Sequence, residues 1–164
     1  MSELTASGRI IAAQNGSVTF KPANTRYELQ LDLRGGPYAG PIDVPVRGII
    51  RVKARKVWTV PAGGNFVAPI LGTPRTIQGR VRQATERVLV IQAGTTIHVE
   101  MPASDVAVDL CSGPITVGAM VNVAAMPGAS FEWVREPAPA STTPGESRGA
   151  MAPEVGRPLG GAAR

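Results

Sequence analysis

Few residues of this chain are of types that do chemistry, and the first to consider is the single histidine, His98. It lies in an alternating segment, Thr96 to Met101, and shares the polar face with Glu100, because side chains two apart on a strand point the same way. A histidine beside a carboxylate can act as a general base. No nucleophile is marked beside this pair, and one histidine provides no metal cluster. We therefore expect a solvated polar pair at His98 and no catalytic residue.

The single cysteine, Cys111, and the acidic residues near it give no stronger signal. A reactive thiol needs a base or a cation beside it, and the preceding Asp109 is neither. We expect a half-buried structural thiol. The loose acidic group of Glu100, Asp105 and Asp109 matches no calcium-loop spacing. These residues predict a protein that is not an enzyme and that uses no cofactor and no metal.

The strongest pattern is a row of cations on one predicted strand between residues 46 and 55. The even positions carry apolar side chains, at Val46, Ile50, Val52 and Ala54. The odd positions carry cations, interrupted by Ile49, at Arg47, Arg51, Lys53 and Arg55. Alternate side chains of a strand point to opposite faces, so the four cations share one exposed face. Lys56 and Trp58 follow at the end of this strand. Four further arginines lie later in the chain, at Arg75, Arg80, Arg82 and Arg87, and together these ten residues are the basic set.

Cations beside an aromatic ring are typical of surfaces that hold a phosphate backbone and stack a base. The charge is concentrated here: residues 44–87 contain nine basic residues and one acid, Glu86, in a chain of net charge +5. We expect this basic set to bind a nucleic acid or another polyanion, with single-stranded nucleic acid favoured. The open alternative is that the charges keep a strand edge soluble or pair it with another copy.

A loop rich in glycine and proline, Pro61 to Pro74, contains four large apolar residues, Phe66, Val67, Ile70 and Leu71. Loops normally run over the surface and carry few such groups. The segment either seals two domains together or contacts another chain. The second function hypothesis is therefore a structural or assembly protein, a homo-oligomer that self-associates through β edges and this loop.

Short strands must position all of these residues. The chain alternates or is apolar at 17–20, 27–33, 46–54, 76–83, 88–91, 96–101, 117–125 and 131–134. No body segment keeps a helical period over three turns, although Asp105–Leu110 could form a short helical turn. Asn15-Gly16 between two apolar runs predicts a hairpin. We expect an all-β fold.

An internal repeat divides the body in two. Collinear matches pair Gly8-Arg9-Ile10 with Gly79-Arg80-Val81, 17–20 with 88–91, Asp32-Leu33 with Asp109-Leu110, and 40–44 with 113–117. They predict a tandem duplication. In length, strand density and the Gly-Arg-Ile/Val opening, both units resemble OB-fold or SH3-like small β-barrels over residues 1–134. The chain is also similar to small uncharacterised β-rich proteins of bacteria. These resemblances imply a fold and no particular function.

The expected organisation has four parts. A first barrel unit covers 1–60, a connecting loop 61–78, a second barrel unit 79–135 and a disordered tail 136–164. The tail has no aromatic and almost no large aliphatic residue, so it cannot bury enough apolar area to offset its ordering entropy. The N-terminus lacks the features of a signal peptide, and no apolar run reaches the ~18 residues of a membrane span. We expect a cytoplasmic protein with no membrane partner.

Overall fold

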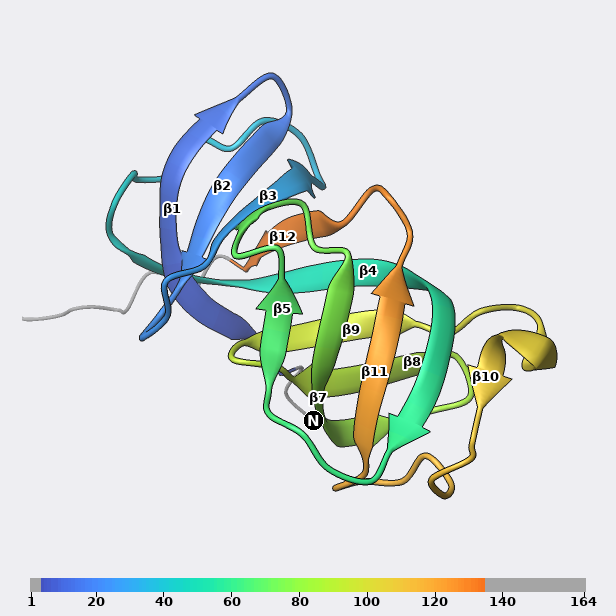
Figure 1. Ribbon diagram of the computed structural model, residues 1–164. Coiled ribbons are helices and arrows are strands. Elements are labelled where there is room, and N and C mark those ends of the chain that lie inside the picture. Colours follow the sequence, from blue (N-terminus) through green and yellow to red (C-terminus); the bar gives the residue numbers. More distant parts are fainter. Residues whose placement is uncertain (1–3, 135–164) are drawn as a thin grey trace, which may run out of the picture. The chain divides into compact units, whose positions relative to one another are not determined.

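The computed structural model describes residues 4–134 (Figure 1). The all-β prediction is confirmed: this part of the chain contains no α-helix and only a 3-10 turn at Asp105–Ala107. The strands are β1 (Ala6–Gln14), β2 (Ser17–Pro22), β3 (Glu28–Leu33), β4 (Pro45–Val60), β5 (Phe66–Ala68), β6 (Leu71–Gly72), β7 (Thr76–Ala84), β8 (Val88–Gln92), β9 (Thr96–Glu100), β10 (Val108–Asp109), β11 (Met120–Ala125) and β12 (Ser130–Val134). The expected disordered tail, 136–164, lies outside the described residues.

Local turn signals are also confirmed. β1 and β2 form the hairpin predicted at Asn15-Gly16, with Gln14 opposite Ser17. Both turn residues have a positive φ, 52° for Asn15 and 78° for Gly16, as a tight two-residue hairpin turn requires. Asparagine and glycine are the residues that adopt this conformation at least cost.

The longest strand, β4, joins two sets of strands. Its first half pairs with β1 and β12, its middle (residues 50–53) pairs with β9, and its last part pairs with β10 and β11. The pairings close two circuits, β1-β2-β3-β12-β4 and β7-β8-β9-β4-β11, which share β4. Each circuit therefore contains a strand from the opposite half of the chain: β12 pairs with β3, and β4 pairs with β9 and β11.

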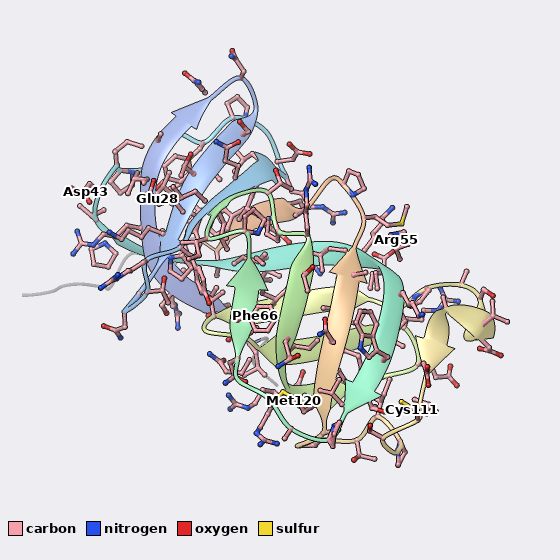
Figure 2. The ribbon with its side chains drawn as sticks, in the orientation of Figure 1. Glu28, Asp43, Arg55, Phe66, Cys111 and Met120 are labelled. Carbon is pink, nitrogen blue, oxygen red and sulfur yellow. The ribbon has the colours of Figure 1, made fainter. Side chains whose placement is uncertain are left out.

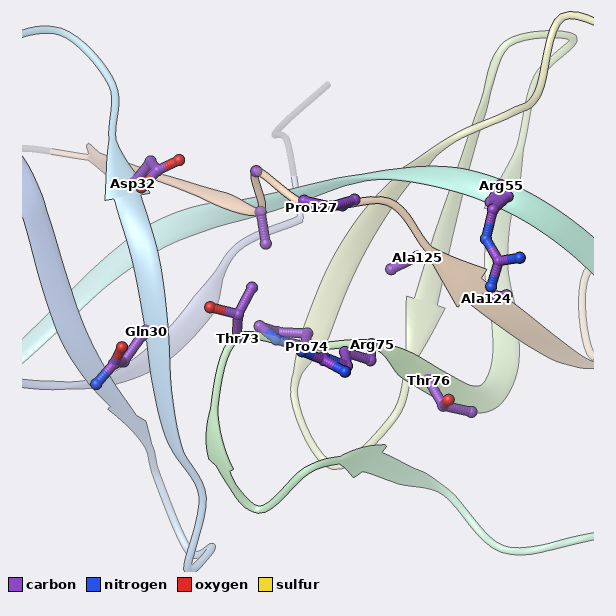
Figure 3. Close-up of a pocket in the computed structure, with 12 residues that line it drawn as sticks. Gln30, Asp32, Arg55, Thr73, Pro74, Arg75, Thr76, Ala124, Ala125 and Pro127 are labelled. Carbon is purple, nitrogen blue, oxygen red and sulfur yellow. The ribbon is translucent and has the colours of Figure 1, made fainter.

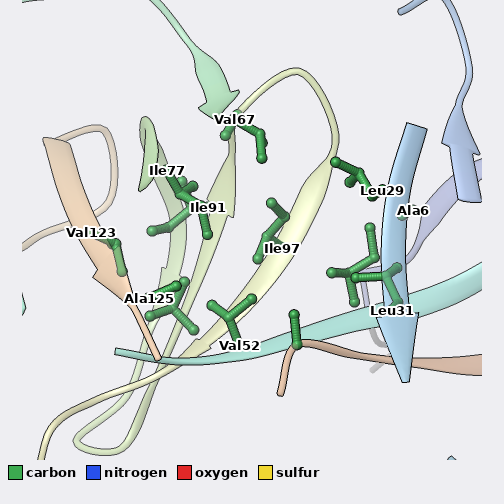
Figure 4. Close-up of a cluster of buried hydrophobic side chains, with 14 of the residues drawn as sticks. Ala6, Leu29, Leu31, Val52, Val67, Ile77, Ile91, Ile97, Val123 and Ala125 are labelled. Carbon is green, nitrogen blue, oxygen red and sulfur yellow. The ribbon is translucent and has the colours of Figure 1, made fainter. Parts of the chain in front are cut away.

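A single cluster of buried apolar side chains runs through both circuits (Figure 4). Leu29 and Leu31 come from β3, whereas Ile77, Ile91 and Val123 come from the other circuit, and all are almost fully buried. Aromatics are scarce, at 4% of the chain, so branched aliphatic residues fill most of this core. The described body therefore stabilises itself by apolar burial that the two circuits share.

The hairpins β1–β2 and β7–β8 are built alike. A Cβ at Gly8 would overlap the carbonyl oxygen of Lys21, and a Cβ at Gly79 would overlap that of Gln92. The register then shifts in both hairpins, between Ile10 and Ala12 in one and at the corresponding place of β7 in the other. Each glycine thus allows the following strand to approach closely, which a side chain would prevent.

The arginine after each of these glycines makes the same contact. Arg9 Nη1 donates to the carbonyl oxygen of Asp43 at 2.7 Å, and Arg80 Nη1 donates to that of Gly118 at 3.0 Å. Asp43 and Gly118 both have a positive φ. Their amides donate at 2.8 Å to equivalent carbonyls, those of Ile10 and Val81. The Gly-Arg-Ile/Val motif therefore has one structural role at both of its occurrences.

The two later sequence matches have no such equivalence. The contacts pair Asp43 with Gly118, which shifts the expected alignment of 40–44 with 113–117 by two residues. Asp32 lies in β3, between β2 and β12, whereas Asp109 lies in the two-residue strand β10 against the end of β4. Ser17 and Val88 occupy matching positions in the two hairpins. Asp32 lies opposite Ser17 and Glu100 lies opposite Val88, so the residue that corresponds to Asp32 is Glu100 and not Asp109. Short matches cannot locate insertions in loops, which is why these two alignments were wrong.

Candidate polyanion-binding pocket

The predicted basic face of β4 is present in part. Lys53 and Arg55 are exposed while Val52 and Ala54 are buried, as alternation predicts. Ile49 lies between Arg47 and Arg51 but is not part of an exposed face, because it is 3% exposed. Gly48, Ile49 and Ile50 are buried in succession, so both faces of the strand are covered where β4 passes between its two sets of neighbours.

The two earlier arginines of the predicted row, Arg47 and Arg51, do not contribute to the same surface as Arg55. Arg51 is half-buried and its Nη2 donates to Glu132 Oε1 on β12 at 3.0 Å. Arg47 lies eight positions before Arg55, which corresponds to about 26 Å along a strand. It pairs in register with Ser7 and Val134 at the start of β4. These two arginines therefore do not share a site with Arg55.

A register shift turns two successive cations of β4 outward. Lys56 lies opposite Ala124 of β11, but Ala54 lies opposite Ala125, so Arg55 has no partner in the ladder. Both Arg55 and Lys56 are exposed as a result. Past this point the buried positions change from even to odd numbers, beginning with Val57. The shift thus places a cation pair where strict alternation would place one cation.

Lys56 and Trp58 then lie on the same outward face. The Lys56 Nζ is 5.7 Å from the centre of the Trp58 ring, within the range of a cation–π contact. Trp58 is partly exposed rather than part of the buried core. Its ring is therefore available at the surface beside a cation.

Arg55 and Arg75, twenty positions apart in the chain, line one pocket of about 780 Å³. Figure 3 shows Arg55 of β4 on one side, Gln30 and Asp32 of β3 on the other, and the Thr73–Arg75 segment between them. Thr76 and the turn between β11 and β12 complete the wall. Within residues 4–134, the guanidinium groups of Arg55 and Arg75 make no ion pair and no hydrogen bond. The pocket therefore presents two arginines that form no ion pair with a described acid, together with one carboxylate, Asp32, in its wall.

The outward face next to the pocket carries a row of four side chains. The strand register aligns Trp58 of β4, Asn122 of β11, Gln78 of β7 and Phe66 of β5. Figure 2 shows Arg55 and Phe66 toward opposite sides of this face. Asn122 Nδ2 donates to Gln78 Oε1 at 3.0 Å, and Gln78 Nε2 donates to the carbonyl of Gly64 at 2.9 Å. An aromatic ring thus lies at each end of an ordered amide pair.

The remaining predicted cations lie elsewhere. Arg80 bonds to the carbonyl of Gly118, and Arg82 is exposed beyond it on β7. Arg87 lines a different pocket, of about 740 Å³, whose wall also contains three acids, Glu86, Glu100 and Asp105. Of the ten residues predicted for this site, the structure brings Arg55 and Arg75 into one pocket and places Lys56 beside Trp58 on the neighbouring face.

Sequence reasoning missed Gln30, Asp32 and the threonines at 73 and 76. Nothing in the local pattern of β3 marks its residues as part of a site on β4. Their approach depends on β12, which pairs in parallel with β3 and antiparallel with β4. A signal could have come only from co-variation or from the fold.

The apolar loop is divided between core and surface. Val67 is 2% exposed and Phe66 half-buried, because β5 pairs with β7. Ile70 and Leu71 are 54% and 63% exposed, although β6 pairs in parallel with β3. The segment therefore connects strands of both circuits and also leaves two large apolar side chains in water.

Two expectations about single residues were wrong. His98 is 5% exposed, not solvated, and the carbonyl oxygen of Leu4 lies 2.7 Å from its Nε2. Cys111 is exposed rather than half-buried, since it lies on the loop after β10, with its amide bonded to Asp109 Oδ1. Among residues 4–134, no group of three or more potential metal ligands occurs.

No family model, curated protein or solved structure matches this chain. The described residues also include no helix with the length and apolar character needed to cross a membrane.

Proposed function

We propose that the pocket between β3 and β4 binds the phosphate backbone of a nucleic acid. The observation that carries this proposal is that Arg55 and Arg75 line one pocket and that neither forms an ion pair within residues 4–134. Guanidinium groups suit phosphate because their planar donors can bind two of its oxygens at once. No residue set for catalysis accompanies them, so the proposal is a binding module rather than an enzyme.

The ligand is single-stranded under this proposal. Trp58 lies two positions beyond Lys56 on the same face, about 7 Å along the strand. A base of a single strand can leave its neighbours and stack on such a ring, whereas a base within a duplex is already stacked on both sides. Phe66 offers a second ring three strands away.

The test replaces Arg55 and Arg75 by glutamine in one variant and Arg82 and Arg87 in a matched control. Both variants lose two positive charges. We expect the first to weaken binding of a labelled single-stranded oligonucleotide strongly. Its slope of log affinity against log salt should fall by about 1.4, because each phosphate contact to a single strand contributes about 0.7.

The control variant should keep most of the affinity, since its residues lie outside the pocket. Fluorescence anisotropy over a salt series measures both quantities. A wild-type protein that binds no nucleic acid at low salt contradicts the proposal. If both variants lose the same affinity, binding depends on the net charge of the protein and not on this pocket, which also contradicts the proposal.

We extend the proposal to the fold: the chain is a tandem duplication of a five-stranded barrel whose two copies exchange one strand. The two closed circuits support this duplication. So do the equivalent contacts in the two hairpins: those of Gly8 match those of Gly79, and that of Arg9 matches that of Arg80. In this scheme β12 replaces the second half of β4 in the first barrel. The barrels would then share β4 instead of separating near residue 60.

A second candidate function, self-assembly, has support from Ile70 and Leu71, which are exposed at adjacent positions. Replacing both by serine should shift any dimer toward monomer and change the free energy of unfolding by less than about 1 kcal/mol, because little burial is lost. Sedimentation velocity over a concentration series gives the measurement. A control variant with serine at Val106 and Val117, also exposed, should assemble as the wild type does. A wild type that stays monomeric throughout would exclude this candidate.

A further inference from the structure

One residue of the pocket does not suit a simple phosphate site. Asp32 is exposed in the pocket wall, on the opposite side from Arg55 (Figure 3). Within residues 4–134 its carboxylate has no ion pair and no side-chain hydrogen bond. Gln30 lies two positions earlier on the same face of β3. A carboxylate here repels a passing phosphate, unless the ligand also presents a hydrogen-bond donor.

The sugar–phosphate backbone has only one such donor. A DNA backbone between its ends offers acceptors alone, whereas each nucleotide of RNA adds a 2′-hydroxyl group, which can donate. The amino groups of the bases are less suitable, because the bases are directed to Trp58, on β4 beyond Lys56 and away from β3. The donor that can reach Asp32 next to a bound phosphate is therefore the ribose hydroxyl.

We infer that this pocket selects RNA over DNA. A phosphate lies between Arg55 and Arg75, and the neighbouring 2′-hydroxyl donates to the carboxylate of Asp32, with the side chain of Gln30 beside it. A volume of about 780 Å³ is within the range of pockets that enclose a small organic ligand, so one nucleotide unit fits. The inference rests on the proposed function and deepens it by naming the class of nucleic acid.

The test compares three labelled twelve-residue uridine oligomers that carry 2′-hydroxyl, 2′-O-methyl or 2′-deoxy sugars. The wild type should bind the 2′-hydroxyl oligomer about tenfold or more tightly than the other two, as expected for a hydrogen bond to a charged group. The 2′-O-methyl probe keeps the sugar conformation of RNA but lacks the donor. It should therefore behave like the deoxy oligomer.

The variant Asp32→Ala should lose the preference, so that the three affinities agree within about twofold. Deoxy binding should also rise, because a negative charge that repels phosphate is gone. Glu28→Ala is the matched control: Glu28 lies on the same strand and face, but outside the pocket wall, and its removal should leave the preference unchanged. Thermal unfolding midpoints verify that both variants fold.

The outcomes separate the two proposals. Equal wild-type affinity for ribose and deoxyribose oligomers overturns the RNA inference and leaves nucleic-acid binding intact. A preference that survives in Asp32→Ala overturns the role of that residue and thus the inference. Absence of binding to all three probes overturns the proposed function and the inference with it.

Discussion

Replacing Phe131 by alanine should lower the free energy of unfolding by about 3–5 kcal/mol. The ring is fully buried, and its centre lies 4.9 Å from that of Phe20. Phe131 also lies against Gly48 of β4, where a Cβ would overlap its ring. Its removal leaves a cavity between β2, β4 and β12 that rigid strands cannot close. Urea unfolding followed by tryptophan fluorescence measures the loss.

The same substitution at Phe66 is the control. Phe66 is half-buried on the short strand β5, so we expect well under half of the loss seen at Phe131. The comparison tests the position of β12 directly. If Phe131→Ala costs less than about 1 kcal/mol, β12 does not complete the first circuit, and the exchange of strands is wrong.

The second large effect should come from Gly79→Ala, with a loss of about 3 kcal/mol or more. The added Cβ overlaps the backbone carbonyl of Gln92 and would lie 2.7 Å from Ile91 Cγ2. A backbone atom paired in a strand cannot move aside as the end of a side chain can, so this overlap is at the costly end of overpacking. Thermal and urea unfolding give the change in stability.

Gly8→Ala should produce a comparable loss, because the corresponding Cβ meets the carbonyl of Lys21 and lies 2.7 Å from Phe20 Cζ. Gly64→Ala is the control, since a Cβ there has no atom within 4 Å. Similar losses at 8 and 79 support the duplication that we propose. A tolerated alanine at either position would mean that the two hairpins approach less closely than their shared motif implies.

Sequence patterns predicted the structure correctly where it depends on residues that are close together in the chain. Asn15-Gly16 specified a hairpin because those residues accept positive φ, and the runs at 17–20 and 88–91 became β2 and β8. The exposed side of β4 was predictable at Lys53 and Arg55. Alternation did not predict that Lys56 is exposed next to Arg55. That exposure results from the register shift between β4 and β11 at Ala124 and Ala125, which depends on the partner strand.

Local patterns in the sequence specified the longer strands, the exposed cations of β4 and the shared Gly-Arg motif, because a strand's period of two and a glycine's missing Cβ act over a few residues. They did not predict the short strands β5, β6 and β10. Which cations lie close together depended on the pairing of distant strands. Arg75 joins Arg55, and Asp32 joins both, through pairings of β3, β7 and β11 that connect distant parts of the chain. The contact between His98 and the carbonyl of Leu4, 94 positions earlier in the chain, is of the same kind. Such contacts depend on which strands become neighbours, and alternation within one strand carries no information about its neighbour.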